Sequence, residues 1–457
     1  MTCSETEVSE QVYYLLQRYF IHYSLSILQT EVYKTVTFTA DILLLPDCTD
    51  NSDMGHTRIK TVAHLCLLYI CICFGRTAIL KADQLHSPTW GYSIDMPSGF
   101  TLTYKDTHSA YQFEHELFPL TLVIRSWEQY TPSGEKMKEI LTKLNAHGES
   151  TDVEWCGKTC TLSFFDMPAQ TGLNRGRAAC IPTDRGVTLV LCYAPENRFE
   201  QLEPLMLSVL DAFSPQSAAP NTSGIITAFA YPARGSRHEH IRMEKTDIPI
   251  ELDLADSEAH NALIAREYGV LLSFAETPFR DEAWKRYYRM IYRDAYTRLE
   301  KTAVSIHKAL KAEIDAQDNR AAAKGETGSA ASHTERERAL AQKLLSWTQT
   351  LPYERRLNSS DFTGLIDTLT GTGSDCDSRS LLLAVLMSHM NHKTMLFISP
   401  EYAHALFGVD IQGAGARLTE SGIAYLLGET TARVNIGMIA QDMSNSTKWF
   451  GITGLGL

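Results

Sequence analysis

Apolar and polar residues alternate in short stretches between residues 88 and 214. From Tyr92 to Met96 every second residue is apolar, and the stretch stops at Pro97-Ser98-Gly99. Four further runs bounded by turn residues have the length and composition of strands, at 120–124, 161–165, 176–181 and 187–193. Apolar residues then recur at helical spacing from Leu202 to Phe213. The pattern predicts a small α/β sandwich, an antiparallel sheet covered by a helix.

The composition of the chain changes after residue 214. Residues 215–224 are small, polar and proline-bearing, which is typical of a linker between domains. A second domain at 225–457 is predicted to begin with strands near 225–231 and 247–253. A helical half with an aromatic packing stripe follows from 257 to 310. Residues 315–335 are poor in apolar side chains, so we expect a mobile loop there. The predicted fold class is therefore α+β.

The composition limits the classes of function and partner that the protein could have. The chain has 457 residues, 44% hydrophobic, with 42 Lys plus Arg against 54 Asp plus Glu and a net charge of -12. Such a chain buries two or three cores, and its acidic balance argues against a nucleic-acid partner. The pair His238 and His240 lacks the further ligands of a zinc site, and no phosphate-binding or dinucleotide motif is present, so we expect neither a metal nor a cofactor.

The N-terminal residues predict export. Residues 54–82 combine a basic start, an apolar run at 65–74 and a small residue at Ala82, the pattern of a signal peptide. The run is too short for a permanent transmembrane helix. Residues 1–53 carry eight acids and two bases, so we interpret them as a non-native or disordered extension before a start at Met54. The alternative is a structured extension. Export would place the protein in the periplasm or cell envelope.

Five cysteines follow the expected cleavage site. Four lie close together, at positions 156, 160, 180 and 192, and in an oxidising compartment they could form disulfides whose pairing the sequence does not reveal. Cys376 stands alone, so it is either a buried apolar residue or a reactive thiol.

The surroundings of Cys376 favour the reactive thiol. Residues 371–375, Gly-Thr-Gly-Ser-Asp, form a loop with a capping residue, and the apolar run 381–387 continues as a buried helix. Cys376 is thereby placed in the first helical turn, where unpaired backbone N–H groups and the helix dipole favour a thiolate.

Two strands downstream supply the other groups that thiol catalysis needs. The strand at 403–411 carries His404 near its start, and the strand at 423–427 ends before Glu429. An imidazole can take the thiol proton and a carboxylate can orient the imidazole. Glu420 is the second choice for this acid. Asp410 lies about 20 Å along the strand from His404, beyond contact. Each residue alone is more typical of an ordinary structural position, but their joint order favours a catalytic site.

These motifs resemble the transglutaminase-like cysteine peptidase superfamily, which has a papain-like fold. The resemblance is carried by residues 347–355, by Asp375-Cys376-Asp377-Ser378-Arg379, by Tyr402-Ala403-His404-Ala405 and by Glu429-Thr430-Thr431. It implies Cys376 as nucleophile, His404 as base and later acid, and Glu429 as orienting acid. The family usually has Asp where Glu429 stands, and cross-linking members have an aromatic residue at the position of Asp377.

Asp375 and Asp377 flank the nucleophile, where a negative charge would raise the pKa of the thiol unless it caps the helix. We therefore interpret both as capping or substrate-positioning residues. We expect the Cys376 N–H to bind the oxyanion, with Gln349 as a second donor or, equally, as a structural residue. Residues 88–214 resemble PsbP/Mog1-like domains in layout only.

The expected function is acyl transfer through a Cys376 thioester, most simply hydrolysis of a protein or peptide amide in the cell envelope. Two alternatives remain open: protein-glutamine cross-linking, and a non-catalytic binding or scaffold module that keeps the fold. The sequence does not indicate an oligomeric state.

Overall fold

The computed structural model describes residues 84–106, 108–170, 172–216, 221–323, 332–354 and 362–455. The predicted extension at 1–53 and the predicted signal peptide at 54–82 lie outside these ranges. All elements described below belong to one compact unit that spans residues 79–457. No helix within the described ranges is long and apolar enough to cross a membrane.

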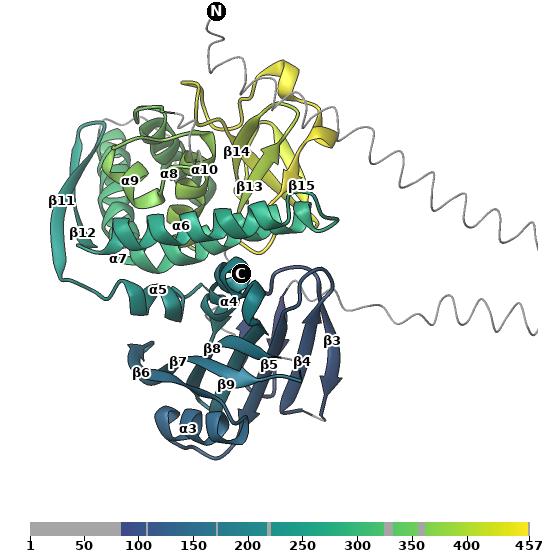
Figure 1. Cartoon of the computed structure of the whole chain (residues 1–457). Helices are drawn as coiled ribbons and strands as arrows, with labels where there is room; N and C mark the ends of the chain where they lie inside the picture. The colour runs from purple at the N-terminus through teal and green to yellow at the C-terminus, as the bar shows by residue number, and fades with distance from the viewer. Residues whose placement is uncertain are drawn as a thin grey trace, which may run out of the picture. The chain divides into compact units, whose positions relative to one another are not determined.

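A seven-stranded antiparallel sheet forms the first half, in the order β3-β4-β5-β9-β8-β7-β6 (Figure 1). Its strands are β3 (Phe100–Lys105), β4 (Ala110–His115), β5 (Thr121–Trp127), β6 (His147–Trp155), β7 (Lys158–Pro168), β8 (Leu173–Thr183) and β9 (Gly186–Pro195). Helix α4 (Glu196–Asp211) buries its apolar side against one face, and α3 (Ser133–Lys143) packs on the other. The predicted sandwich of sheet and helix is therefore present, with α3 in addition.

A small sheet of β1 (Leu85–Ser87), β2 (Tyr92–Ile94) and β10 (Phe213–Ser214) completes this half. Tyr92 and Phe213 are fully buried, with ring centroids 5.2 Å apart. The chain that leaves α4 is thereby fixed beside the start of the domain.

The cysteines of this half are free thiols. Cys160 and Cys192 belong to the apolar core under α4, whereas Cys180 belongs to the core under α3 on the opposite face of the sheet. Cys156 is exposed in the turn between β6 and β7. A sheet separates Cys180 from the other two buried thiols, so the possible disulfide framework does not form here.

The second half combines helices with a separate antiparallel sheet. The helices are α5 (Ile225–Ala230), α6 (Asp256–Ser273), α7 (Arg280–Ala323), α8 (His333–Thr348), α9 (Leu365–Thr370) and α10 (Cys376–Ser388). The sheet has the order β15-β16-β14-β13-β17, formed by β13 (Thr394–Ser399), β14 (His404–Val409), β15 (Arg417–Glu420), β16 (Ile423–Gly428) and β17 (Phe450–Gly451). Two 3-10 turns, η1 (Gln441–Met443) and η2 (Ser446–Lys448), precede β17. The predicted α+β class is confirmed.

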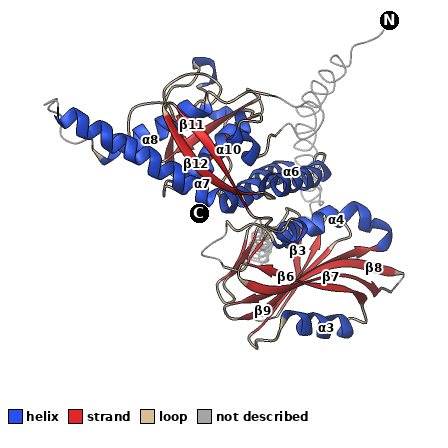
Figure 2. Ribbon diagram, turned by 90° about the vertical axis from the view of Figure 1, so that its left-hand side faces the viewer, coloured by secondary structure: helices blue, strands red, loops and turns tan. Residues whose placement is uncertain are grey.

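Of three local expectations for this half, one is confirmed and two need correction. Residues 225–230 form helix α5 rather than a strand. The strand expected at 247–253 is β12 (Thr246–Asp253), and it pairs with β11 (Ser236–Met243) in a hairpin beside α7 (Figure 2). Residues 315–323, expected in a loop, are the last turns of α7, and 333–335 begin α8. Residues 324–331 lie outside the described ranges.

Helix α7 is shared by the two halves. Its aromatic stripe is a packing face, as predicted, because Tyr288 and Tyr292 are buried in the core that contains α10. Ala283 and Met290 instead lie in the core beneath the seven-stranded sheet, together with Phe274, which follows α6.

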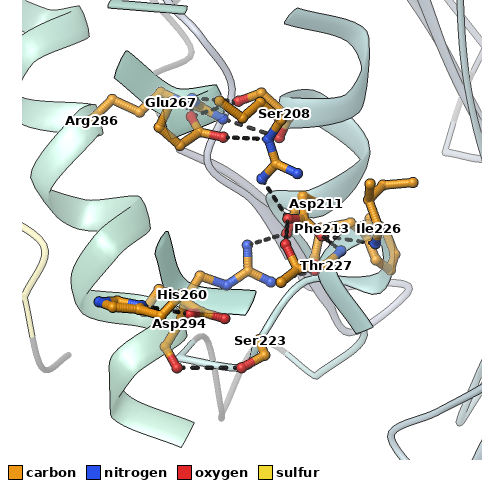
Figure 3. A network of polar contacts seen from close by, with 12 residues as sticks. Ser208, Asp211, Phe213, Ser223, Ile226, Thr227, His260, Glu267, Arg286 and Asp294 are labelled. Atoms are coloured by element: carbon orange, nitrogen blue, oxygen red, sulfur yellow. Dashed lines mark hydrogen bonds and ion pairs between the residues drawn. The ribbon is translucent and has the colours of Figure 1, made fainter. Parts of the chain in front are cut away.

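Buried ion pairs and hydrogen bonds join α4 to α6 and α7 (Figure 3). Arg286 binds Glu267 at 2.9 Å and donates to the Ser208 hydroxyl at 2.8 Å. Seven residues further along α7, Arg293 donates to the backbone oxygens of Asp211 and Phe213. These groups are almost completely buried, so each depends on its partner to offset the loss of water.

Candidate active site

Helix α10 begins at Cys376, as the sequence predicts. Gly371 has a φ of 79°, a left-handed conformation that ends α9 and suits glycine. Asp375 then caps α10: its carboxylate accepts from the Ser378 N–H at 2.7 Å, and the Ser378 hydroxyl accepts from the Asp375 N–H at 2.9 Å. This reciprocal capping box holds the nucleophile candidate in the first turn.

The thiol of Cys376 lies between a carboxylate and the start of β14. Its Sγ donates to Asp377 Oδ1 at 3.1 Å, and the Ala405 N–H also lies against the sulfur. Burial, and then the charges of Asp377 and Asp375, raise the pKa of the Cys376 thiol well above its usual value, although the Ala405 N–H lowers it. The direction of this shift is opposite to the stabilisation of a thiolate that the helix start predicts.

His404 and Glu429 form a close pair. His404 opens β14 opposite Ser399 of β13, and its Nε2 lies 2.8 Å from Glu429 Oε2. The other carboxylate oxygen accepts from the N–H and the hydroxyl of Thr431, each at 2.7 Å. Burial raises the pKa of Glu429, but the bonds from His404 and Thr431 outweigh it, and the net shift is downward. The glutamate is thus an anion held at two points beside the imidazole.

Cys376 and His404 are connected through the backbone at the start of β14. Because Ala405 follows His404 directly and its N–H reaches Cys376, the nucleophile candidate lies beside the start of β14. Among the described residues, the hydrogen bonds of Cys376 include Asp377 but not His404. The Nδ1 of His404 is the ring nitrogen that Glu429 leaves for a thiol proton.

The competing acids lie elsewhere. Asp410 accepts from the Lys393 N–H at 2.9 Å, at the far end of β14 from His404. Glu420 ends β15 and lies against Gly451 of β17. Neither carboxylate is bonded to His404, so Glu429 is the acid that the structure brings to the imidazole.

Gln349 binds the backbone of the loop that carries Glu429. Its Nε2 donates to the backbone oxygens of Glu429 at 2.8 Å and Val434 at 3.0 Å. Both N–H groups of the amide are occupied in this way, which favours the structural alternative for Gln349 over a role as oxyanion donor.

Arg379 joins three loops around the site, and no function was predicted for it from the sequence. It is buried, and it donates to the Ser374 hydroxyl at 2.7 Å, to the Thr430 oxygen at 2.9 Å and to the Leu351 oxygen. These contacts fix the loop before Cys376 and the loop after Glu429 to one side chain. The sequence does carry a signal for this anchoring role: an arginine lies one turn after Cys376, at the start of a helix expected to be buried. A charge buried there needs partners, because unpaired buried charges are costly.

Two aromatic residues distant in sequence complete the surroundings. The Tyr288 hydroxyl, on α7, donates to the carboxylate of Asp377. The Trp449 ring lies edge-on to the His404 ring, with centroids 6.3 Å apart, and its Nε1 donates to the Met443 oxygen at 2.9 Å. Nothing local marks either residue, because both reach the site through tertiary packing.

No group of three or more His, Cys, Asp or Glu side chains within the described ranges could hold a metal ion. The chain matches no family model and no curated protein. Three solved structures are similar in part. A cyanobacterial PsbP from Synechocystis sp. PCC 6803 shares 14% identity over 29% of this chain and 90% of its own, with a TM-score of 0.26.

The second is LpqN, involved in cell envelope biogenesis of Mycobacterium tuberculosis, with 10% identity over 29% of this chain and 88% of its own and a TM-score of 0.23. A protein of Bacteroides thetaiotaomicron shares 10% identity over 47% of this chain and 77% of its own, with a TM-score of 0.22. A PsbP protein is thus among the similar solved structures, but all three TM-scores are too low to support an argument about fold or function.

Proposed function

We propose that this protein is a thiol enzyme that hydrolyses an amide bond of a protein or peptide through a Cys376 thioester. The observation that supports it is the His404–Glu429 pair at 2.8 Å, which leaves His404 Nδ1 for a proton, beside a cysteine at the first turn of α10. A nucleophile, a base and a group that orients the base are the parts this chemistry requires.

The reaction proceeds in two steps. The Cys376 proton passes to His404 Nδ1 as the sulfur attacks the carbonyl carbon, and the Cys376 N–H donates to the oxyanion. The C–N bond then breaks, His404 returns the proton to the leaving amine, and a thioester remains. Water, deprotonated by His404, attacks the thioester, and the C–S bond breaks to release the acid and the thiol. Glu429 stays ionised and stabilises the imidazolium.

Asp377 sets a condition on this cycle. Its Oδ1 accepts the hydrogen bond from Cys376 Sγ at 3.1 Å, so the thiol must turn from Asp377 toward His404 before it can attack. A substrate group that binds Asp377, such as a backbone or side-chain N–H, would release the thiol at the moment the acyl group arrives.

A second candidate is a non-catalytic binding module that retains the fold. The raised pKa of the Cys376 thiol and its bond to Asp377 favour this candidate, since a thiol that stays protonated does not attack carbonyls.

Alkylation by iodoacetamide distinguishes the two candidates. The tryptic peptide that contains Cys376 is followed by mass spectrometry from pH 6 to 10, with the peptide of the fully buried Cys192 as an internal control. If His404 can take the proton, adding a peptide substrate mixture should speed alkylation or compete with it, and His404→Ala should remove either effect. Alkylation that is slow, indifferent to peptides and unchanged in His404→Ala would support the binding module. For a substrate found by thiol-probe profiling, Cys376→Ala must abolish hydrolysis.

We also propose that the protein acts outside the cytoplasm, from the sequence pattern at 54–82. N-terminal sequencing of secreted material is expected to begin near Asp83, and a retained Met1 would contradict export.

A further inference from the structure

Strand β6 is an edge strand of the seven-stranded sheet, and α5 contacts it (Figure 1). It is nine residues long, and the six residues from His147 to Asp152 are all exposed. It pairs with β7 along its whole length with no register shift. A long and regular edge offers a ladder of backbone groups to another extended chain.

The register shows which backbone groups point outward. The two-residue turn at Cys156 and Gly157 makes Trp155 and Lys158 a hydrogen-bonded pair, so the odd-numbered residues of β6 bond to β7. The N–H and C=O groups of residues 148, 150, 152 and 154 therefore face away from the sheet. None of these four residues has a backbone hydrogen bond to another described element.

The opposite edge of the same sheet provides a contrast. Strand β3 has an irregular register between Leu102 and Tyr104, and it ends in Lys105. A bulge and an edge lysine are two of the common devices that prevent strands from adding to a sheet. Strand β6 contains no bulge, no proline and no lysine or arginine.

A hollow of about 290 Å³ opens next to the first residues of β6, on the face that carries α4. Phe164, 38% exposed, and Phe199 line it with the Arg177 guanidinium, whose carbon lies 4.4 and 4.5 Å from the two ring centroids. Glu149 also lines this hollow. The hollow lies where every second side chain of an added strand would project, and an apolar side chain fits its aromatic walls.

The charge of β6 specifies the occupant. Glu149, Asp152 and Glu154 are its acidic side chains, and it contains no Lys or Arg. In an added strand, a residue whose N–H points at β6 lies opposite residue 150, 152 or 154, and its side chain shares their face of the sheet. Lysines at these positions would face Asp152 and Glu154, and the alternate side chains would face the hollow.

We propose that the β6 edge binds an extended polypeptide segment in which basic residues alternate with apolar ones, by adding it as an eighth strand. This interaction is independent of the thiol chemistry: it requires only the sheet edge, its acidic side chains and the hollow.

The probe is a fluorescein-labelled peptide of eight residues in which lysine alternates with valine, bound to the full chain and measured by fluorescence anisotropy. Two matched peptides are the same sequence with N-methyl groups on the lysine amides, and the same sequence with glutamate in place of lysine. N-methylation keeps the charge but removes the N–H groups that would face β6. We expect each change to weaken binding by about tenfold or more.

The matched protein variants are Ser150→Pro and Ser150→Ala. Ser150→Pro removes an outward N–H without breaking a bond to β7, and both variants remove the side-chain bond to Ser163. Only Ser150→Pro should lose the probe, by about tenfold, with circular dichroism confirming that both variants fold. Equal binding of the methylated and unmethylated peptides would overturn the proposal, because attraction between charges alone would then explain binding, and so would equal binding by the two Ser150 variants.

Discussion

We expect the charge of Asp377 to hold the pKa of the Cys376 thiol high and its reactivity low, and the substitution Asp377→Asn tests this expectation directly. The carboxylate oxygen lies 3.1 Å from Sγ. Two unit charges at about 4 Å interact by roughly 1 kcal/mol in water and about 4 kcal/mol at the effective dielectric near a protein surface. At about 1.4 kcal/mol per pKa unit, removal of the charge should lower the pKa of Cys376 by about one to three units. We expect the lower part of this range, because Asp377 is partly exposed.

The neighbouring Asp375 opposes part of this change. Burial first, and the charge of Asp377 second, raise the pKa of Asp375 to about 7. Without the charge at 377, Asp375 ionises at a lower pH and returns some negative charge to the site. The double variant Asp375→Asn, Asp377→Asn should therefore have the more reactive thiol, since Asn also caps a helix well.

The assay is the alkylation rate of Cys376 by iodoacetamide at pH 7.5. While the thiol is mostly protonated, the rate rises about tenfold for each unit by which its pKa falls, so Asp377→Asn should react about tenfold faster or more. Tyr288→Phe is the matched control, because it removes the donor to Asp377 and keeps the charge. It should react no faster than the parent. Our reasoning is refuted if Asp377→Asn is unchanged or slower, or if Tyr288→Phe is equally fast, which would indicate loosening of the site rather than charge.

Three further predictions concern stability and support of the site. Burial lowers the pKa of His115 to about 4, so the contribution of its neutral ring to the free energy of unfolding is complete above about pH 6.5 and is lost as the pH falls toward 4. Urea unfolding should therefore show that the parent loses up to roughly 3 kcal/mol of this free energy over that range, and that His115→Gln does not. Arg286→Leu leaves Glu267 without one of its buried partners and should cost about 3 to 5 kcal/mol in the same assay, and a cost below about 1 kcal/mol would contradict the network's importance. Gln349→Ala removes two bonds to the loop after β16, so we expect a lower melting temperature together with slower Cys376 alkylation, whereas slower hydrolysis at unchanged stability would restore the oxyanion role.

The local placement of the three candidate site residues could be predicted because local signals fix it. Glycines end α9, a capping aspartate begins α10, and alternation marks the strands that hold His404 and precede Glu429. Their convergence depends on β14 lying between β13 and β16, an order that follows from tertiary packing and not from the strand pattern itself.

Errors in the prediction arose where local preference is ambiguous or is overridden. Residues 225–230, Ile-Ile-Thr-Ala-Phe-Ala, are an apolar run that suits a strand, yet they form a helix whose backbone N–H groups at Ile226 and Thr227 bind the buried Asp211. Residues 315–323 are poor in large apolar side chains, but they contain four Ala together with Gln317 and Arg320, which are good helix formers, and they extend α7. In both cases the prediction relied on the residue types of a short segment, which do not determine its secondary structure.

The direction of the shift in the pKa of Cys376 could not be decided from the sequence for a different reason. A helix start favours the thiolate by a small amount that falls off within one turn, whereas burial and two nearby carboxylates act in the opposite direction. The sequence shows Asp375 and Asp377 but not the burial, which depends on how α10 packs under β14 and α7. The sign of the shift is therefore a property of the tertiary fold.

Helix α7 gives the sheet domain a route to this site. Arg286, Arg289 and Arg293 bind residues of the first half, and Tyr288, on the same two turns, binds Asp377. A shift of α7 that breaks the arginine contacts would also move the Tyr288 hydroxyl. Since that hydroxyl donates to the carboxylate that accepts from the thiol, we expect such a shift of α7 to change the reactivity of Cys376.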